Sequence, residues 1–170
     1  PATVVLPTGT GKTETMLSMQ VYSRLPRTLV IVPTDALRKQ IANKFLTLGV
    51  LPDAEVIPLE TLGPRVARMT KGIQSKEEAE QLIQEANVIV TLPNTLYASD
   101  SEALSYLAEH CSDLIVDEAH HVPASQWSAV RDLFAKKRIT QFTATPFRRD
   151  KKRVDGKIIF NFKLGDAQAA

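Results

Sequence analysis

The chain has 170 residues, of which 44% are apolar and 24% are charged. This balance is that of one average globular domain and excludes a disordered, collagenous or coiled-coil chain. No apolar run approaches the ~18 residues of a membrane span, so no membrane partner is expected. The single cysteine, Cys111, has no partner for an internal disulfide, which is typical of a reducing, cytoplasmic setting.

The net charge of +2 conceals an uneven distribution. Residues 1–135 carry 11 basic and 16 acidic side chains, whereas residues 136–170 carry 10 basic and 3 acidic side chains. The clearest basic run spans residues 148–153. Such a run forms either a solvated surface or a surface that binds phosphates, and its charge alone does not distinguish the two.

Short β-branched runs alternate with helical patterns along the chain. Strands are expected at Thr3–Leu6, Thr28–Val32, Glu55–Pro58, Asn87–Leu92, Leu114–Asp117 and Ile139–Thr143. Helical spacing of apolar residues predicts one helix through Leu37, Ile41, Phe45 and Leu48 and another through Ala79, Leu82, Ile83 and Ala86, with Ser75 as its cap. Residues 59–75 show no clear period.

Two of these strands, at residues 29–32 and 88–90, are almost continuously apolar. Such strands are buried on both faces, which favours a mainly parallel central sheet with helices on both faces. The predicted fold class is therefore α/β, with a ligand at the carboxyl ends of the strands. Because the chain opens directly into an apolar strand at Pro1, we expect it to be a piece of a longer protein.

A glycine-rich turn, Leu-Pro-Thr-Gly-Thr-Gly-Lys-Thr, occupies residues 6–13 between a strand and a helical pattern. The two glycines let several backbone N–H groups point at one anion, and the following helix adds its positive end. Lys12 can then reach the β- and γ-phosphates, and the Thr13 hydroxyl can bind Mg²⁺. The general P-loop pattern has glycine where Leu6 stands, so the match is incomplete. The residues expected to bind nucleotide are Thr8, Gly9, Thr10, Gly11, Lys12 and Thr13.

Two adjacent carboxylates, Asp117 and Glu118, follow an apolar strand. Since successive side chains of a strand point to opposite faces of the sheet, the two acids are expected to have different functions. Asp117 suits the Mg²⁺ shell, and Glu118 suits polarising a water for attack on the γ-phosphate, with Lys12 as the second catalytic residue. Alone, such a pair is typical of a turn or a helix start. Together with the glycine-rich turn it predicts a nucleotide-hydrolysing site.

A third stretch, Thr143-Ala144-Thr145-Pro146, ends a predicted strand. Its two hydroxyls can hydrogen-bond a neighbouring carboxylate or imidazole, although a capped strand end has the same appearance. In order along the chain, the glycine-rich turn, Val-Asp-Glu-Ala-His-His and Phe-Thr-Ala-Thr-Pro-Phe-Arg resemble the first RecA-like domain of a superfamily-two helicase of the DEAD/DEAH-like, type III restriction enzyme-like group. The resemblance extends from Leu6 to about Arg149.

This resemblance implies a RecA-like P-loop NTPase domain over residues 1–150, with ATP and Mg²⁺ as cofactors. Residues 151–170 would be a basic segment and tail that lead toward a second RecA-like domain of the parent chain, the expected protein partner. His120, Thr143 and Thr145 would couple the nucleotide state to nucleic acid. Two weaker matches, Val-Pro-Thr at 32–34 and Thr-Leu-Pro-Asn-Thr at 91–95, would line a groove for DNA or RNA. Their expected contacts with the nucleic-acid backbone are Thr34, Thr91 and Asn94.

The resemblance predicts the ATP-binding half of a helicase or translocase. The glutamine-centred adenine motif and the arginine finger of such motors are absent from these 170 residues, and an arginine finger is worth roughly 10³–10⁵ in rate. We therefore expect the isolated chain to bind Mg-nucleotide weakly and to hydrolyse it slowly. The alternatives are a duplex DNA translocase subunit of a restriction-modification system and a non-catalytic nucleotide sensor. Retention of Lys12, Asp117 and Glu118 argues against the sensor.

Overall fold

A computed structural model describes residues 1–121, 124–145 and 156–162. The strands are β1 (Ala2–Val5), β2 (Thr28–Ile31), β3 (Val66–Arg68), β4 (Val88–Thr91), β5 (Asp113–Val116), β6 (Arg138–Thr143) and β7 (Lys157–Asn161). The helices are α1 (Lys12–Tyr22), α2 (Asp35–Thr47), α3 (Lys76–Glu85), α4 (Pro93–Tyr97), α5 (Ser101–His110) and α6 (Ala124–Leu133), with a 3₁₀ turn, η1, at Ala119–His121.

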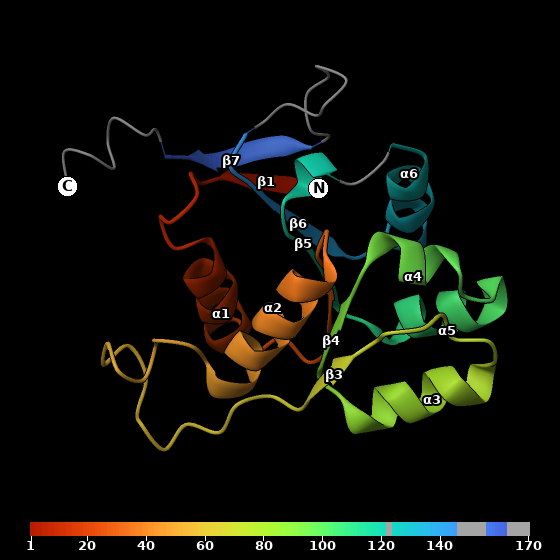
Figure 1. Cartoon of the computed structure of the whole chain (residues 1–170), viewed down its shortest axis with the longest axis horizontal. Coiled ribbons are helices and arrows are strands. Elements are labelled where there is room, and N and C mark those ends of the chain that lie inside the picture. Colours follow the sequence, from red (N-terminus) through yellow and green to blue (C-terminus); the bar gives the residue numbers. More distant parts are fainter. Residues whose placement is uncertain (122–123, 146–155, 163–170) are drawn as a thin grey trace.

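The described strands form one sheet in the order β3-β4-β2-β5-β6-β1-β7, and every pairing is parallel. Helices α1 and α2 cover one face, and α3, α5 and α6 cover the other (Figure 1). All residues of β2, β4 and β5 are buried, as expected of strands covered on both sides. The predicted α/β class with a parallel sheet is confirmed.

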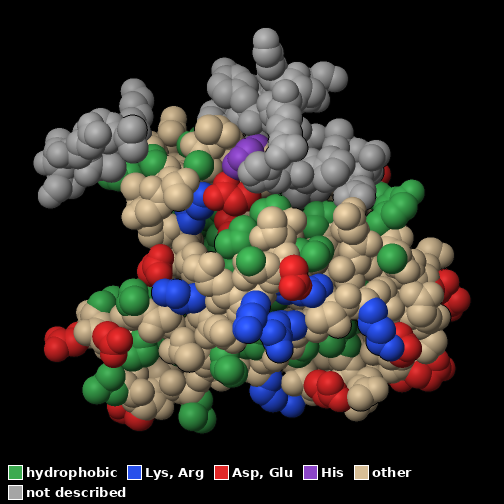
Figure 2. Space-filling view, viewed as in Figure 1, with side chains coloured by type: hydrophobic (Ala, Val, Ile, Leu, Met, Phe, Trp, Pro, Cys, Tyr) green, Lys and Arg blue, Asp and Glu red, His purple; other side chains and the backbone are tan. Residues whose placement is uncertain are grey.

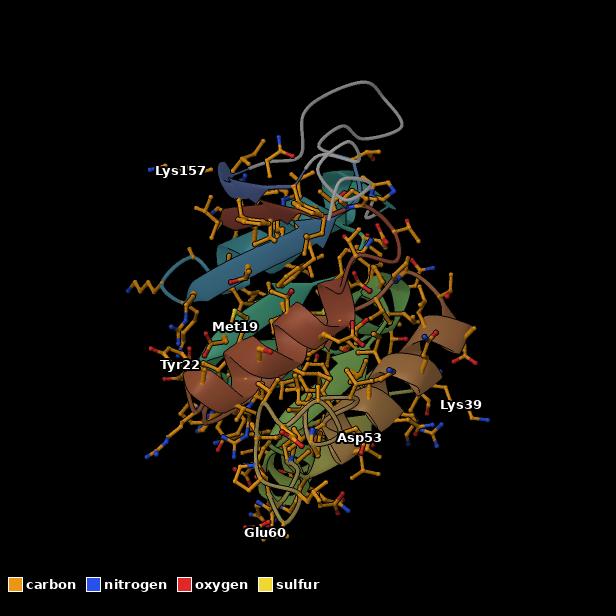
Figure 3. All side chains as sticks on the ribbon, turned by 90° about the vertical axis from the view of Figure 1, so that its left-hand side faces the viewer. Met19, Tyr22, Lys39, Asp53, Glu60 and Lys157 are labelled. Atoms are coloured by element: carbon orange, nitrogen blue, oxygen red, sulfur yellow. The ribbon has the colours of Figure 1, made fainter. Side chains whose placement is uncertain are left out.

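Each face of the sheet has its own apolar core. Met16, Leu17 and Phe45 from α1 and α2 pack on one side of the strands, and Leu107 and Phe134 pack on the other. Figure 3 shows α1 and α2 side by side on their face, with Asp53 and Glu60 on the long connection that follows α2. The helices packed on the two faces hold the strands in place, so that the carboxyl ends of the strands lie together at one end of the sheet.

Both helices predicted from periodicity are present, and their starts follow from side-chain caps. The Thr34 hydroxyl accepts a hydrogen bond from the backbone N–H of Leu37 at the start of α2. Ser75 caps α3 in the same way through Glu78, as predicted. Leu48 ends α2 as a buried residue with left-handed backbone (φ 60°) rather than as part of the helix.

The strand predicted at Glu55–Pro58 is wrong. These residues lie in turns, where Glu55 has a φ of 56° and the backbone N–H of Val56 bonds back to Leu51. Val56 is also 61% exposed, so its β-branched side chain has no sheet to pack against. The edge strand is instead β3, within a segment whose sequence shows no period.

Strand β7 is a second difference, because it lies within residues 151–170, for which the sequence predicts only a basic segment and tail. It pairs in parallel with β1 and closes that end of the sheet. Its five residues are all exposed, and an edge strand of this kind has no buried alternation to reveal it. The basic run at 148–153 and the expected boundary at residue 150 lie outside the described residues. Within the described part of the chain, no helix combines the length and apolarity that crossing a membrane requires.

Candidate functional site

The residues predicted for the nucleotide site and its coupling to nucleic acid meet at the carboxyl ends of three adjacent strands, β5, β6 and β1. The glycine-rich turn follows β1, Asp117 and Glu118 follow β5, and Thr143 is the last residue of β6. Basic, acidic and histidine side chains lie together at the top of the space-filling view (Figure 2). This edge is where a parallel α/β sheet presents a ligand site.

Two glycines shape the turn through their backbone conformation. Gly9 and Gly11 have φ angles of 82° and 92°, in the left-handed region that L side chains rarely adopt. Thr10 closes the turn, because its N–H and its hydroxyl both donate to the carbonyl of Pro7, at 3.3 and 2.8 Å. Gly11 is the N-cap of α1 and offers no side-chain acceptor, so the first-turn N–H groups are left to bind an anion. Thr8 is exposed at the tip of the turn.

Lys12 and Glu118 form an ion pair across the site. The Lys12 Nζ donates to Glu118 Oε1, and the two side chains are only 10% and 18% exposed. The pair joins the start of α1 to the end of β5, although 106 residues separate the two positions. An anion that binds in the turn would therefore compete with Glu118 for the Lys12 ammonium group.

Asp117 lies beneath this pair and is 4% exposed. Burial, together with the neighbouring charge of Glu118, raises the pKa of Asp117 to about 6, although Lys12 acts in the opposite direction. The carboxylate accepts a hydrogen bond from the backbone N–H of Glu118 at 2.9 Å. Two adjacent carboxylates of which one is buried favour a bound cation.

Strand alternation does not separate the two acids, contrary to the expectation from sequence. Strand β5 ends at Val116, and Glu118 follows in a left-handed turn with a φ of 49°. A non-glycine residue in this conformation is uncommon and is often found at functional sites. The turn, rather than the pleat, therefore gives the acids different surroundings.

The donor set fits Mg²⁺ that arrives with a nucleotide. Thr13, in the first turn of α1, and Asp117 supply hard oxygen donors, and Mg²⁺ characteristically combines one or two protein ligands with phosphate oxygens and water. Among the described residues, no group of three or more His, Cys, Asp or Glu side chains could hold a metal by itself. Glu118 Oε2 is buried and accepts no hydrogen bond there.

The three predicted coupling residues form one hydrogen-bonded chain. The hydroxyl of Thr143 donates to the carbonyl of Thr145 (2.6 Å) and lies 2.7 Å from Nδ1 of His120. Because that hydroxyl hydrogen is already used, we assign the bonding hydrogen to His120 Nδ1. The same Nδ1 is 3.4 Å from Glu118 Oε2. This series of contacts therefore connects the end of β6 to the carboxylate that pairs with Lys12.

The three residues predicted to contact nucleic acid differ in their exposure to solvent. Thr34 is exposed at the start of α2, and Asn94 is exposed in the first turn of α4. Thr91 is completely buried, with its hydroxyl 3.5 Å from the carbonyl of Met69, so its side chain cannot reach a ligand at the surface. The sequence carries no signal for this burial, because a threonine at the end of an apolar strand shows the same pattern whether its side chain is buried or exposed.

A cleft of about 510 Å³ is lined both by residues predicted for the nucleotide site and by a residue predicted to contact nucleic acid. Its lining residues are Thr8, Pro33, Thr34, Leu37, Glu118, His120 and Ala144. Pro33, Leu37 and Ala144 form its apolar walls. Thr34 therefore opens into the same space as the side chains of Glu118 and His120.

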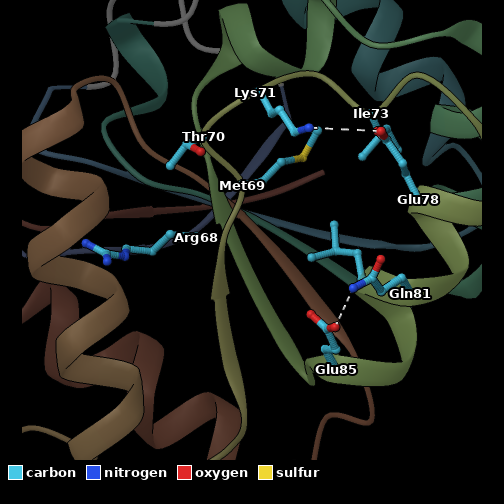
Figure 4. A pocket seen from close by; sticks show the side chains of 9 residues that line it. Arg68, Met69, Thr70, Lys71, Ile73, Glu78, Gln81 and Glu85 are labelled. Atoms are coloured by element: carbon cyan, nitrogen blue, oxygen red, sulfur yellow. Dashed lines mark hydrogen bonds and ion pairs between the residues drawn. The ribbon is translucent and has the colours of Figure 1, made fainter.

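A smaller hollow, about 260 Å³, lies between the end of β3 and α3 (Figure 4). Its charged side chains partly satisfy one another: Lys71 lies 4.0 Å from Glu78, and Gln81 donates to Glu85 at 2.8 Å. Arg68 points toward α2 (Figure 4). None of the predicted site residues lines this hollow.

The family described as "Type III restriction enzyme, res subunit" matches residues 1–148. The "Probable ATP-dependent RNA helicase Dbp45A" of Drosophila melanogaster is 27% identical over 118 residues, which are 66% of this chain and 20% of that protein. The Hef helicase domain of Pyrococcus furiosus is 25% identical with a TM-score of 0.57, over 88% of this chain and 31% of that one. The UvsW helicase of bacteriophage T4 is 18% identical with a TM-score of 0.64, over 94% and 54%.

These structural neighbours have the RecA-like α/β fold, which confirms the fold predicted from the three motifs. The chain spans between about a fifth and about half of the length of these relatives.

Proposed function

The chain belongs to the type III restriction enzyme res subunit family, as a first RecA-like domain of the superfamily-two helicase type, and from this we propose that it is the nucleotide-binding half of an ATP-dependent motor that moves on nucleic acid. The observation that carries the proposal is the pairing of Lys12 with Glu118 at the mouth of the glycine turn. The pairing supports the proposal that Lys12 binds phosphate and that Glu118 accepts a proton at one reaction site.

In this proposal, Lys12 leaves Glu118 when phosphates bind at the N-terminus of α1. The freed carboxylate of Glu118 then orients a water and accepts its proton as the water attacks the γ-phosphate. Bound Mg²⁺, held by Thr13 and Asp117, would neutralise charge on the phosphate oxygens. Asp117 acts as an ionised ligand, so metal binding should weaken as the pH falls below its pKa of about 6, where a proton competes for the carboxylate.

His120, Thr143 and Thr145 would carry the nucleotide state to the end of β6. Their hydrogen bonds begin 3.4 Å from Glu118 and continue through the Thr143 hydroxyl. A change in the partners of Glu118 would alter the hydrogen bond of His120 first. This arrangement supports a local coupling role for the three residues.

Thr34 and Asn94 would contact phosphates of a DNA or RNA strand rather than base edges. Exposed polar side chains at the starts of two helices suit phosphate oxygens and give no base readout. A second RecA-like domain of the parent chain would close over the site and supply the cationic stabilisation that the site requires. The parent chain is therefore the form in which rapid turnover is expected.

The proposal is tested by ATP hydrolysis in the full-length parent with single-stranded DNA, duplex DNA or RNA. We expect Glu118→Gln to lower turnover by about 10²–10⁴-fold, which is the contribution of a positioned general base. Glu109→Gln, an exposed residue on α5, is the matched control and should leave turnover unchanged. Unchanged turnover in Glu118→Gln would show that this carboxylate does not act in hydrolysis.

A further inference from the structure

An apolar hollow of about 410 Å³ opens beside the glycine-rich turn. It is lined by Val4, Leu6, Thr10, Thr15, Phe160 and Phe162, and we call it the β7 pocket. Thr10 belongs to the turn itself, and Thr15 lies in the first turn of α1. Its volume falls within the range of about 300–1,000 Å³ that is usual for small-molecule sites.

The β7 pocket exists because the sheet extends beyond α1. Val4 pairs with Phe160 across β1 and β7, and the N–H of Phe162 continues the pairing by donating to Val5 at 3.0 Å. Residues 160 and 162 lie on the same face of the strand as Val4, which is the face that α1 covers. Helix α1 does not fully cover the edge strand β7, and Phe160 is 53% exposed.

We propose that the β7 pocket binds the base of the nucleotide whose phosphates lie in the glycine-rich turn. This inference rests on the proposed function, because the phosphates fix where the base can lie. The pocket shares Thr10 with the glycine-rich turn, so a base held there would lie next to phosphates bound at the N-terminus of α1. Aromatic faces bind bases by stacking, which suits two phenylalanines beside an apolar strand.

The polar groups of the pocket predict weak discrimination between bases. The hydroxyl hydrogens of Thr10 and Thr15 are already donated to the carbonyls of Pro7 and Gly11, both at 2.8 Å. The described lining side chains therefore offer the base no hydrogen-bond donor. Stacking does not distinguish one purine from another, so ATP and GTP should bind with affinities within about threefold of each other.

The test is calorimetric titration of the chain with Mg-ATP, Mg-GTP and Mg-tripolyphosphate, which lacks a base. Phe160→Ala should weaken binding of both nucleotides by about tenfold and leave tripolyphosphate binding unchanged. Ile158→Ala is the control, because Ile158 is also exposed and pairs with Thr3, whose side chain lies on the face of the sheet opposite to that of Val4. Phe162→Ala, checked for an unchanged melting temperature, should repeat the effect.

The possible failures are distinguishable. Equal affinities of the unmodified chain for ATP and tripolyphosphate, or an unchanged ATP affinity in both phenylalanine variants, would overturn the base assignment alone. Lys12→Ala should weaken all three ligands, since it removes the phosphate-binding cation. If Lys12→Ala bound tripolyphosphate as tightly as the unmodified chain, the proposed phosphate site would fail, and the β7 pocket would lose its anchor with it.

Discussion

Arg27 joins the ends of two helices to the sheet and offers a sharp test of how this fold is held together. It directly precedes β2, and its guanidinium donates to three backbone carbonyls. Nη2 bonds Ile83 at 2.8 Å, Nε bonds Ala86 at 3.2 Å, and Nη1 bonds His110 at 3.1 Å. Ile83 and Ala86 lie at the end of α3, and His110 is the last residue of α5. A cation at these ends also complements both helix dipoles.

The magnitude follows from how buried each bond is. A hydrogen bond from a charged donor contributes about 1.5–3 kcal/mol when buried, and less in water. Two of the Arg27 bonds are partly buried and the bond to His110 is exposed, so we expect Arg27→Met to cost about 2–4 kcal/mol. For a domain of this size, that loss lowers the melting temperature by about 4–16 °C.

The assay is urea and thermal unfolding of Arg27→Met, Arg27→Lys and Arg65→Met. Lysine keeps the charge but not the planar fork, so Arg27→Lys should fall between the other two variants. Arg65 is exposed just before β3 and serves as the control, with an expected change within about 0.5 kcal/mol. If Arg27→Met were as stable as Arg65→Met, the three carbonyls would not depend on this guanidinium and the reasoning would be refuted.

Three further predictions follow from single contacts. Ser75→Ala removes the cap of α3 and should cost about 1 kcal/mol in urea unfolding, whereas Ser105→Ala on the exposed side of α5 should cost much less. Burial raises the pKa of Cys111 to about 12, so at about pH 8 a disulfide reagent should label it only as fast as the fold opens, and rapid labelling of the folded chain would contradict this burial. In the full-length parent, Thr143→Val should lower the ratio of nucleic-acid-stimulated to basal ATP hydrolysis, and Thr143→Ser should restore it because serine keeps the hydroxyl that bonds His120.

Much of the fold was predictable because the central strands are buried on both sides. Apolar runs such as residues 29–32 and 88–90 favour a parallel sheet covered on both faces, and Ser75 marks the start of its helix. The edges were not predictable on the same grounds. Strands β3 and β7 each pair on one side only and lack a buried repeat. Glu55–Pro58 has β-branched residues but lies in a connection without a partner strand.

The sequence predicts which residues gather at the candidate site but not which contacts they make there. The sequence pattern places Asp117 and Thr143 at or directly after the ends of strands and Lys12 at the start of the helix that follows β1, and a parallel sheet gathers such positions at one end. It could not show that Thr91 is buried, because a strand-end threonine appears the same whether its hydroxyl points inward or outward. It also could not show the β7 pocket, since that pocket depends on how far the sheet extends past α1. Both facts belong to tertiary packing rather than to local pattern.

Glu118 is the residue at which these contacts converge, and its backbone explains why. One carboxylate oxygen bonds Lys12, on the phosphate side, while the other lies 3.4 Å from His120, on the coupling side. A regular extension of β5 would point successive side chains to opposite faces of the sheet and would not aim this one along the edge. The left-handed turn at φ 49° does so, at a conformational cost on the order of 1 kcal/mol. Because of this turn, one carboxylate lies between Lys12 and His120, so a substitution that removes Lys12 would leave His120 Nδ1 3.4 Å from the other carboxylate oxygen.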